Sequence, residues 1–203
     1  MRWCSVLLSI SFFVLSVNLF SNPREGIGSR GKSCYTGKKV MEGMGRMLDF
    51  DNLQNYRENN QIEAKQALGG LPESIWETYS AFANADGGII LLGVEELEDK
   101  TLHALDLLDP QWLIDDFLTI LNDTSRVSVN ILTEEDIQIH KIDGKHIISI
   151  TVPKADPRCR PVYVEGDVLR GTYRRSGEGD YRCTPEEIEA MLAEREKLCT
   201  VQF

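Results

Sequence analysis

An uninterrupted apolar run covers residues 88–94, with the sequence Gly-Ile-Ile-Leu-Leu-Gly-Val. Because no polar residue alternates with the apolar ones, this run predicts a central strand that is covered on both faces. Before it, Ile75, Tyr79 and Phe82 recur at the spacing of one helix face. The sequence Asp-Gly-Gly lies between the two patterns, and it predicts a helix that ends and turns directly into the central strand.

Similar patterns predict further elements on both sides of this pair. Helical spacing predicts a short helix over residues 49–58 and another over 110–122, and the buried side of the second is expected to hold Trp112, Phe117, Ile120 and Leu121. Strands are predicted over residues 61–68, 127–132, 136–142 and 145–152, near Tyr163, and over 171–175. Asp143-Gly144 is typical of a hairpin turn, and Thr184-Pro-Glu-Glu187 is a capping box that opens a last helix. This order predicts an α/β (α+β) fold, in which helices pack on a mixed β-sheet.

Residues 1–46 differ from the rest of the chain. Arg2 and the apolar segment over residues 6–20 follow the plan of a signal peptide, but no good cleavage site of small residues follows. The apolar segment is also short for a membrane span. Since three methionines precede the first globular sequence, a misassigned start is an equally good explanation. We expect a disordered leader, signal-like or misassigned, over residues 1–46 and one domain over 47–203, with no membrane partner unless the leader is a real anchor.

The leader contains Gly26-Ile-Gly-Ser-Arg-Gly-Lys-Ser33, which satisfies the Gly-x4-Gly-Lys-Ser pattern of phosphate-binding loops. Such a loop needs a buried strand before its first glycine and a helix that opens at the Lys-Ser pair. Here a polar segment with a proline precedes the loop, and Gly37 and Gly43 interrupt the segment after it. A chance match in a linker is therefore favoured, and ATP is not expected as a cofactor.

Composition and charge limit the classes of function. The 203 residues are 42% hydrophobic and 27% charged, which is typical of a globular protein and not of a disordered or polytopic membrane protein. The formal net charge is −10, but residues 154–182 hold 7 Lys or Arg against 5 Asp or Glu, whereas residues 41–153 hold 7 against 21. An anionic partner is therefore expected to meet the later region. The five cysteines and three histidines show no zinc-like spacing, so we expect reduced thiols in a cytoplasmic protein.

Four motifs then follow one another in a recognisable order. They are Glu58-x4-Glu63-x-Lys65, Tyr79-Ser-Ala-Phe-Ala-Asn-Ala-Asp-Gly-Gly88, Ile90-Leu-Leu-Gly-Val-Glu-Glu96, and Tyr173-Arg-Arg-Ser-Gly177 with Cys183-Thr-Pro-Glu-Glu-Ile188. Over residues 50–195 the chain thereby resembles the Schlafen AlbA-like domain, also called a divergent AAA domain. The resemblance implies a cytosolic α/β module described as DNA-binding, which in many bacterial members is the N-terminal part of a longer regulator.

Some animal proteins that share this resemblance are metal-dependent ribonucleases with three active-site carboxylates. Carried over motif by motif, these acids fall on Glu58, Glu63 and Glu96, which would be both the catalytic residues and the metal ligands. Hard divalent ions such as Mg or Mn take oxygen ligands and activate water for attack on a phosphodiester. Glu96 has a longer side chain than the aspartate that the family has there.

A structural interpretation of the same acids stays open. Glu58 would end a helix at the surface, Glu63 would pair with Lys65 along a strand, and Glu96 would begin an acidic loop. Glu58 and Glu63 would point to opposite faces of one continuous strand, so their convergence requires a turn at Asn59-Asn60.

Basic residues expected to bind nucleic acid are Lys65, Lys154, Arg158, Arg160, Arg170, Arg174, Arg175 and Arg182. Arginine forks suit phosphate, and Tyr173 and Tyr181 offer rings on which bases stack. The alternative is ordinary surface charge that pairs with neighbouring acids.

Asn84, Gly87 and Gly88 also have two interpretations. Glycines let a chain leave a helix through left-handed conformations, and they let a ligand phosphate approach backbone amides closely. Asn84 is expected to cap or orient the turn in both cases.

The sequence therefore predicts first a nucleic-acid-binding module for DNA or RNA, as part of a transcriptional regulator, with homo-oligomerisation left open. The first alternative is a divalent-metal endoribonuclease that uses Glu58, Glu63 and Glu96 with Mg or Mn. The second is a nucleotide-binding regulatory domain. No other cofactor is expected.

Overall fold

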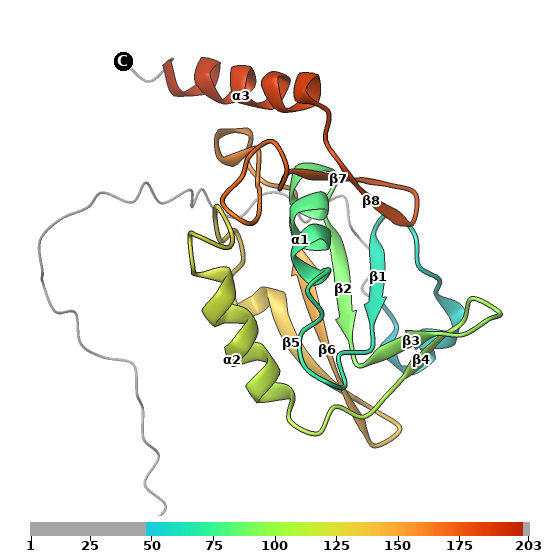
Figure 1. Ribbon diagram of the computed structural model, residues 1–203. Helices are drawn as coiled ribbons and strands as arrows, with labels where there is room; N and C mark the ends of the chain where they lie inside the picture. The colour runs from blue at the N-terminus through green and yellow to red at the C-terminus, as the bar shows by residue number, and fades with distance from the viewer. Residues whose placement is uncertain (1–47, 201–203) are drawn as a thin grey trace, which may run out of the picture. The chain divides into compact units, whose positions relative to one another are not determined.

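A four-stranded sheet forms the centre of the computed structural model, which describes residues 48–200 (Figure 1). The strands lie in the order β1 (Ile62–Lys65), β2 (Gly88–Leu92), β6 (Lys145–Val152) and β5 (Ile137–Ile142). β1 and β2 are parallel, whereas β6 is antiparallel to both of its neighbours. The predicted α/β (α+β) fold with a mixed sheet is confirmed.

The predicted central strand is an interior strand of this sheet, but it ends earlier than expected. Ile90, Leu91 and Leu92 of β2 are buried on both faces. Gly93 then adopts φ +77°, a conformation that few other residues tolerate, and the strand stops there. Val94 begins β3 (Val94–Glu96), which pairs with β4 (Leu102–Ala104) in a hairpin that the apolar pattern did not predict.

Two helices cover one face of the sheet (Figure 1). They are α1 (Ile75–Asn84) and α2 (Pro110–Leu121), and both contribute to one hydrophobic core with the sheet residues Ile90, Ile148 and Ile150. The rings of Trp76 and Phe117 stack at 5.1 Å between centroids and join the two helices. Leu53 of η1 (Phe50–Asn55) packs against the opposite face, so the sheet has a core on each side.

The last part of the described chain forms a hairpin and a helix. The hairpin consists of β7 (Tyr173–Ser176) and β8 (Gly179–Arg182), and the helix is α3 (Pro185–Thr200). The predicted capping box is present, because the Thr184 amide donates to the Glu187 carboxylate (2.8 Å) and the Glu187 amide donates to the Thr184 hydroxyl (3.3 Å). Short 3₁₀ turns, η2 (Glu134–Asp136) and η3 (Pro157–Cys159), complete the elements.

Two predictions about packing are wrong. Residues 127–132 form no strand, and only Val127 makes an isolated bridge, to Val164. The buried Tyr79 hydroxyl provides hydrogen bonds to the backbone of this segment instead. It donates to the Val129 carbonyl (3.0 Å) and accepts from the Ile131 amide (3.0 Å). Trp112 was expected on the buried side of α2 but is 56% exposed, whereas Phe117 and Leu121 are buried as predicted.

The expectation of reduced thiols is met in part. Cys183 and Cys199 are free, whereas Cys159 is disulfide-bonded, so the expectation is wrong for that residue. Cys4 and Cys34 lie outside the described residues. The same is true of the apolar leader and of the Gly26–Ser33 loop, so the predictions made for them stay predictions. Within residues 48–200, the helices are too short or too polar to cross a bilayer.

Candidate functional site

A tight turn at Asn59 brings the first two predicted carboxylates together. The Asn59 amide donates to the Ile62 carbonyl (3.1 Å), and the Gln61 amide donates to the Asn59 side chain (2.7 Å). Glu58 thereby folds back along β1, where its carboxylate accepts a hydrogen bond from the Ala64 amide (2.9 Å). The turn that convergence with Glu63 requires is therefore present.

The third carboxylate, Glu96, reaches the same neighbourhood through β3. The Gly93 amide donates to the Lys65 carbonyl (2.9 Å), which fixes the start of β3 beside the end of β1. The pKa of Glu58 is raised above its ordinary value, chiefly by burial, and the charges of Glu63 and Glu96 add to this shift. The hydrogen bond from Ala64 opposes it. Each of these carboxylates therefore lies within the electrostatic reach of Glu58.

Arg175 of β7 lies among these acids, and its side chain is only 2% exposed. Its guanidinium donates to Glu63 (2.8 Å) and Asp180 (2.9 Å), and also to the backbone carbonyl of Asn59 (2.8 Å). The guanidinium carbon lies 5.0 Å from the centre of the Phe82 ring. Arg175 thus joins β7, β8, β1 and α1 through one buried cation.

Two lysines complete the charge balance of this carboxylate cluster, by which we mean Glu58, Glu63 and Glu96. The Lys65 ammonium donates to Glu63 (3.0 Å) and to the Ser74 hydroxyl (3.1 Å). The Lys100 ammonium donates to the Oε2 atom of Glu96 (2.8 Å). The Oε1 atom of Glu96 is buried and has no hydrogen-bond partner among the described residues.

The side chains of the carboxylate cluster are not arranged to bind a divalent ion. Within residues 48–200, no group of three or more His, Cys, Asp and Glu side chains is arranged to hold a metal. The physical reason is that Lys65 and Arg175 bind the two oxygens of Glu63 and Lys100 binds one oxygen of Glu96. Together with the Ala64 amide, protein donors therefore bind four of the six oxygens of the carboxylate cluster, which leaves fewer oxygens than a hard cation takes.

Contacts within the protein account for the residues of the helix-to-strand turn. The Asn84 amide group donates to the carbonyls of Val162 (2.8 Å) and Tyr173 (3.0 Å), and its oxygen accepts from the Val162 amide (2.8 Å). A side chain at Gly87 would meet the Val152 carbonyl, and one at Gly88 would meet the Phe82 ring. Protein atoms thus fill the space beside both glycines, and the approach of a ligand phosphate stays a prediction.

The predicted nucleic-acid-binding residues divide into three groups. Lys65 and Arg175 belong to the interior cluster. Four others form ion pairs with carboxylates, namely Lys154 with Asp86 (3.0 Å), Arg158 with Asp156 (2.7 Å), Arg160 with Glu194 (3.1 Å) and Arg174 with Glu187 (3.0 Å). Arg170 is 83% exposed and lies 3.9 Å from Asp167. Arg182 is exposed and donates weakly to the Tyr173 hydroxyl (3.4 Å).

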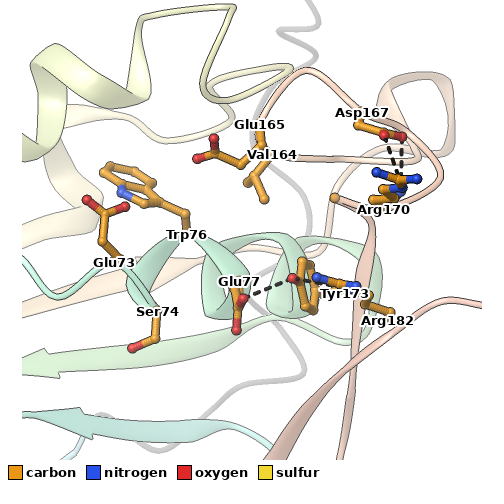
Figure 2. A pocket seen from close by; sticks show the side chains of 11 residues that line it. Glu73, Ser74, Trp76, Glu77, Val164, Glu165, Asp167, Arg170, Tyr173 and Arg182 are labelled. Carbon is orange, nitrogen blue, oxygen red and sulfur yellow. Dashed lines mark hydrogen bonds and ion pairs between the residues drawn. The ribbon is translucent and has the colours of Figure 1, made fainter.

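A cavity of about 430 Å³ lies beside Arg170 and Arg182 (Figure 2). Trp76 and Tyr173 line it, and the Tyr173 hydroxyl donates to Glu77 (2.9 Å). Four carboxylates also line the cavity, those of Glu73, Glu77, Glu165 and Asp167. Because these acids outnumber the two arginines, the cavity is a poor place for a phosphate.

The sequence patterns missed one pairing on the outer face of the β7–β8 hairpin. Arg174 and Tyr181 lie directly opposite each other in the strand register. The guanidinium carbon of Arg174 is 6.0 Å from the centre of the Tyr181 ring, and Tyr181 is 54% exposed. The signal in the sequence is the turn-forming Ser-Gly-Glu-Gly stretch over residues 176–179, which predicts a hairpin and hence this register.

Comparisons with known proteins give one family match and several similar structures. The model of the family described as Schlafen, AlbA_2 matches residues 58–184. The solution NMR structure of the N-terminal domain of a putative ATP-dependent DNA helicase RecG-related protein from Nitrosomonas europaea is 30% identical, with a TM-score of 0.48, and the match covers 66% of this chain and 90% of that one. The crystal structure of the DIP2311 protein from Corynebacterium diphtheriae is 20% identical, with a TM-score of 0.42, and covers 61% of this chain and 22% of that one. No curated protein matches the chain.

Proposed function

The chain belongs to the Schlafen, AlbA_2 family, and from this membership we propose that its domain binds nucleic acid through the outer face of the β7–β8 hairpin. The observation that carries the proposal is the exposed pair of Arg174 and Tyr181. An arginine that meets a phosphate beside a ring that stacks on a base is the usual arrangement for single-stranded nucleic acid.

Of the predicted arginines, Arg174 is the one that lies beside Tyr181 on this outer face, where it pairs with Glu187 at the surface. Arg170 and Arg182 are exposed, but they line the cavity that also holds four carboxylates, and Arg182 is opposite Tyr173 in the strand register. A surface ion pair contributes only about 0 to 1 kcal/mol, so a phosphate can replace the carboxylate at little cost. Arg175 and Lys65 are left out of the proposed contact surface, because both lie inside the carboxylate cluster.

The charge of the domain sets the conditions under which such binding occurs. Residues 48–200 hold 15 Lys or Arg against 30 Asp or Glu, so the domain repels a polyanion at long range. Binding must then come from a few close contacts. For one phosphate contact with a single strand, the slope of log K against log salt is about −0.7.

Fluorescence anisotropy with labelled single-stranded DNA and RNA, measured over a range of salt concentrations, tests the proposal. Tyr181→Ala is expected to weaken binding by roughly tenfold, because a stacked base is lost. Arg174→Ala is expected to reduce the salt slope by about 0.7, because one phosphate contact is lost. Lys145→Ala serves as the matched control, since Lys145 begins β6 at the β5–β6 hairpin, away from the β7–β8 hairpin (Figure 1).

Three outcomes contradict the proposal. They are the absence of binding at low salt, binding that does not depend on salt, and equal losses in Tyr181→Ala and Lys145→Ala. The affinities for DNA and RNA in the same titration decide which nucleic acid the domain prefers. A regulatory role in transcription requires the preference to be for DNA.

The endoribonuclease hypothesis has one observation in its favour, which is the convergence of Glu58, Glu63 and Glu96. The protein cations within the carboxylate cluster count against it, so we derive no catalytic step from the cluster. Calorimetry with Mn²⁺ and incubation with labelled structured RNA test it together. Metal binding and cleavage that are both lost in Glu96→Gln would revive the hypothesis, and their absence in the native chain rejects it.

Glu96→Gln is the appropriate variant for that test. Glu96 contacts an exposed lysine, whereas Glu63 holds the buried Arg175, so loss of Glu63 would also disturb the fold. The nucleotide-binding alternative depends on the Gly26–Ser33 loop, which lies outside the described residues, and it stays a prediction.

A further inference from the structure

Strand β5 forms an open edge of the sheet. Within residues 48–200 its only strand partner is β6 (Figure 1). The two-residue turn at Asp143-Gly144 makes Ile142 and Lys145 a hydrogen-bonded pair. Alternate residues of β5, which are Ile137, Ile139 and Lys141, therefore direct their backbone N–H and C=O groups away from β6. Such an edge is a template for another strand.

An apolar groove runs beside this edge. It has a volume of about 580 Å³ and lies between α2 and β5. Its apolar lining consists of Ile114 and Leu118 from α2, Ile137 and Ile139 from β5, and Leu132. Ile139 is 42% exposed. Edge and groove together present unpaired backbone groups next to apolar side chains. An added strand would bind the backbone groups by hydrogen bonds and cover the apolar side chains.

We propose that β5 pairs in antiparallel fashion with β5 of a second copy of this chain, so that one sheet continues through both copies. The two-fold axis of such a pair keeps the α2 helices of both copies on the same face of the joined sheet. The apolar residues of α2 and β5 then close the two grooves against each other.

The charges at the two ends of β5 favour a second copy as the partner. Glu135 lies in η2, just before the strand, and Lys141 lies near the other end of the strand. Because the two strands run in opposite directions, the end with Glu135 lies beside the end with Lys141 of the second copy, and this happens twice by symmetry. The segment from η2 to the end of β5 thus carries both halves of a complementary charge pattern.

The mass of the full-length chain, measured by sedimentation equilibrium over a range of concentrations, tests this proposal. We expect a monomer–dimer equilibrium with a dissociation constant in the micromolar range, on the order of 10 µM. Ile139→Lys is expected to weaken the dimer at least roughly tenfold, because it places two charges in the apolar seam. Lys141→Glu is expected to weaken it by several-fold, and the double variant Glu135→Lys/Lys141→Glu to restore it, because the pairs are re-formed with opposite signs.

Lys145→Glu is the matched control, since it changes the net charge as Lys141→Glu does but lies outside the paired strand; its dimer should equal that of the native chain. Circular dichroism of each variant checks that the fold is intact. A monomer up to about 100 µM overturns the proposal. So does a dimer that Ile139→Lys leaves unchanged, or a double variant that fails to recover. Limited proteolysis tests whether residues 1–47 occupy the groove. If the native chain is a monomer and Ile139→Lys makes residues 1–47 sensitive to protease, the groove binds the chain's own N-terminal segment, and the dimer proposal is overturned.

Discussion

Arg174 and Arg175 are neighbours on β7, yet they lie in opposite surroundings. Arg175 points inward, where it is almost fully buried and binds two carboxylates and a backbone carbonyl. Arg174 points outward, where it pairs with Glu187 and lies over the Tyr181 ring. The alternation of a β-strand separates them, because successive side chains point to opposite faces.

This difference shows that burial, and not residue type, decides what a charge contributes. On the inner face a cation holds carboxylates that have little access to water, so removing it leaves uncompensated buried charges. On the outer face water solvates both partners, and the same kind of ion pair contributes little to stability. The inner arginine is therefore structural, and the outer one is free to exchange its partner.

Loss of the inner cation should have the largest effect. Arg175→Met is expected to lower the free energy of unfolding by about 3 to 5 kcal/mol, because Glu63 and Asp180 lose the cation that compensates them. Urea unfolding followed by circular dichroism measures this change. A loss below about 1 kcal/mol would show that Lys65 and water compensate the two acids, and the distinction between the faces would then fail.

A smaller effect of the opposite sign is expected at Glu58. Its folded-state pKa lies above the ordinary value of 4.5, so the folded protein holds this proton more tightly than the unfolded chain does. The stabilisation from the group is fully present below pH 4.5 and is lost as the pH rises through the folded-state pKa. Glu58→Gln keeps an acceptor for the Ala64 amide and removes the charge, so it should stabilise the protein at pH 7 by less than about 1 kcal/mol.

The pH dependence provides the check on Glu58. The difference between Glu58→Gln and the native chain should shrink as the pH falls toward 4, because both then carry a neutral side chain. Glu63→Gln is the matched control, and it should destabilise the protein at pH 7, because Glu63 pairs with Lys65 and Arg175. A Glu58→Gln variant that is less stable than the native chain at pH 7 would contradict the shift.

The smallest effect on stability is expected at the outer arginine. Arg174→Ala should change the free energy of unfolding by less than about 0.5 kcal/mol, because its ion pair with Glu187 is exposed to water. The same urea unfolding experiment measures it. A loss that approaches that of Arg175→Met would mean that Arg174 anchors α3, and it would then be a poor phosphate contact.

Much of the fold follows from local patterns. The run at residues 88–94 has no polar position, and its residues 88–92 form an interior strand, whereas the pattern did not show that the strand ends before Gly93. The Asp143-Gly144 pair became the hairpin turn. The strand expected over residues 127–132 failed for a reason that no local pattern contains. Two hydrogen bonds of this segment, at Val129 and Ile131, are made by the Tyr79 hydroxyl, about fifty positions earlier in the chain.

The carboxylate cluster was predictable only in part. The resemblance named the three acids, and spacing showed that a turn at Asn59 was needed to bring Glu58 to Glu63. Neither indicated that Arg175 lies among them, because its contact with Glu63 joins residues far apart in the chain. Strand alternation predicts that Arg174 and Arg175 separate, but only the packed structure shows which of the two faces inward.

The ion pair between Glu63 and Arg175 also affects how the domain is completed during synthesis. The two residues lie 112 positions apart, so the acids near β1 leave the ribosome long before their buried cation does. Until β7 emerges, Lys65 and Lys100 are the cations of this cluster, and the buried cation is missing. The last hairpin therefore completes the packing of the domain, because Arg175 binds Glu63 of β1. Truncation before residue 175 removes this buried cation.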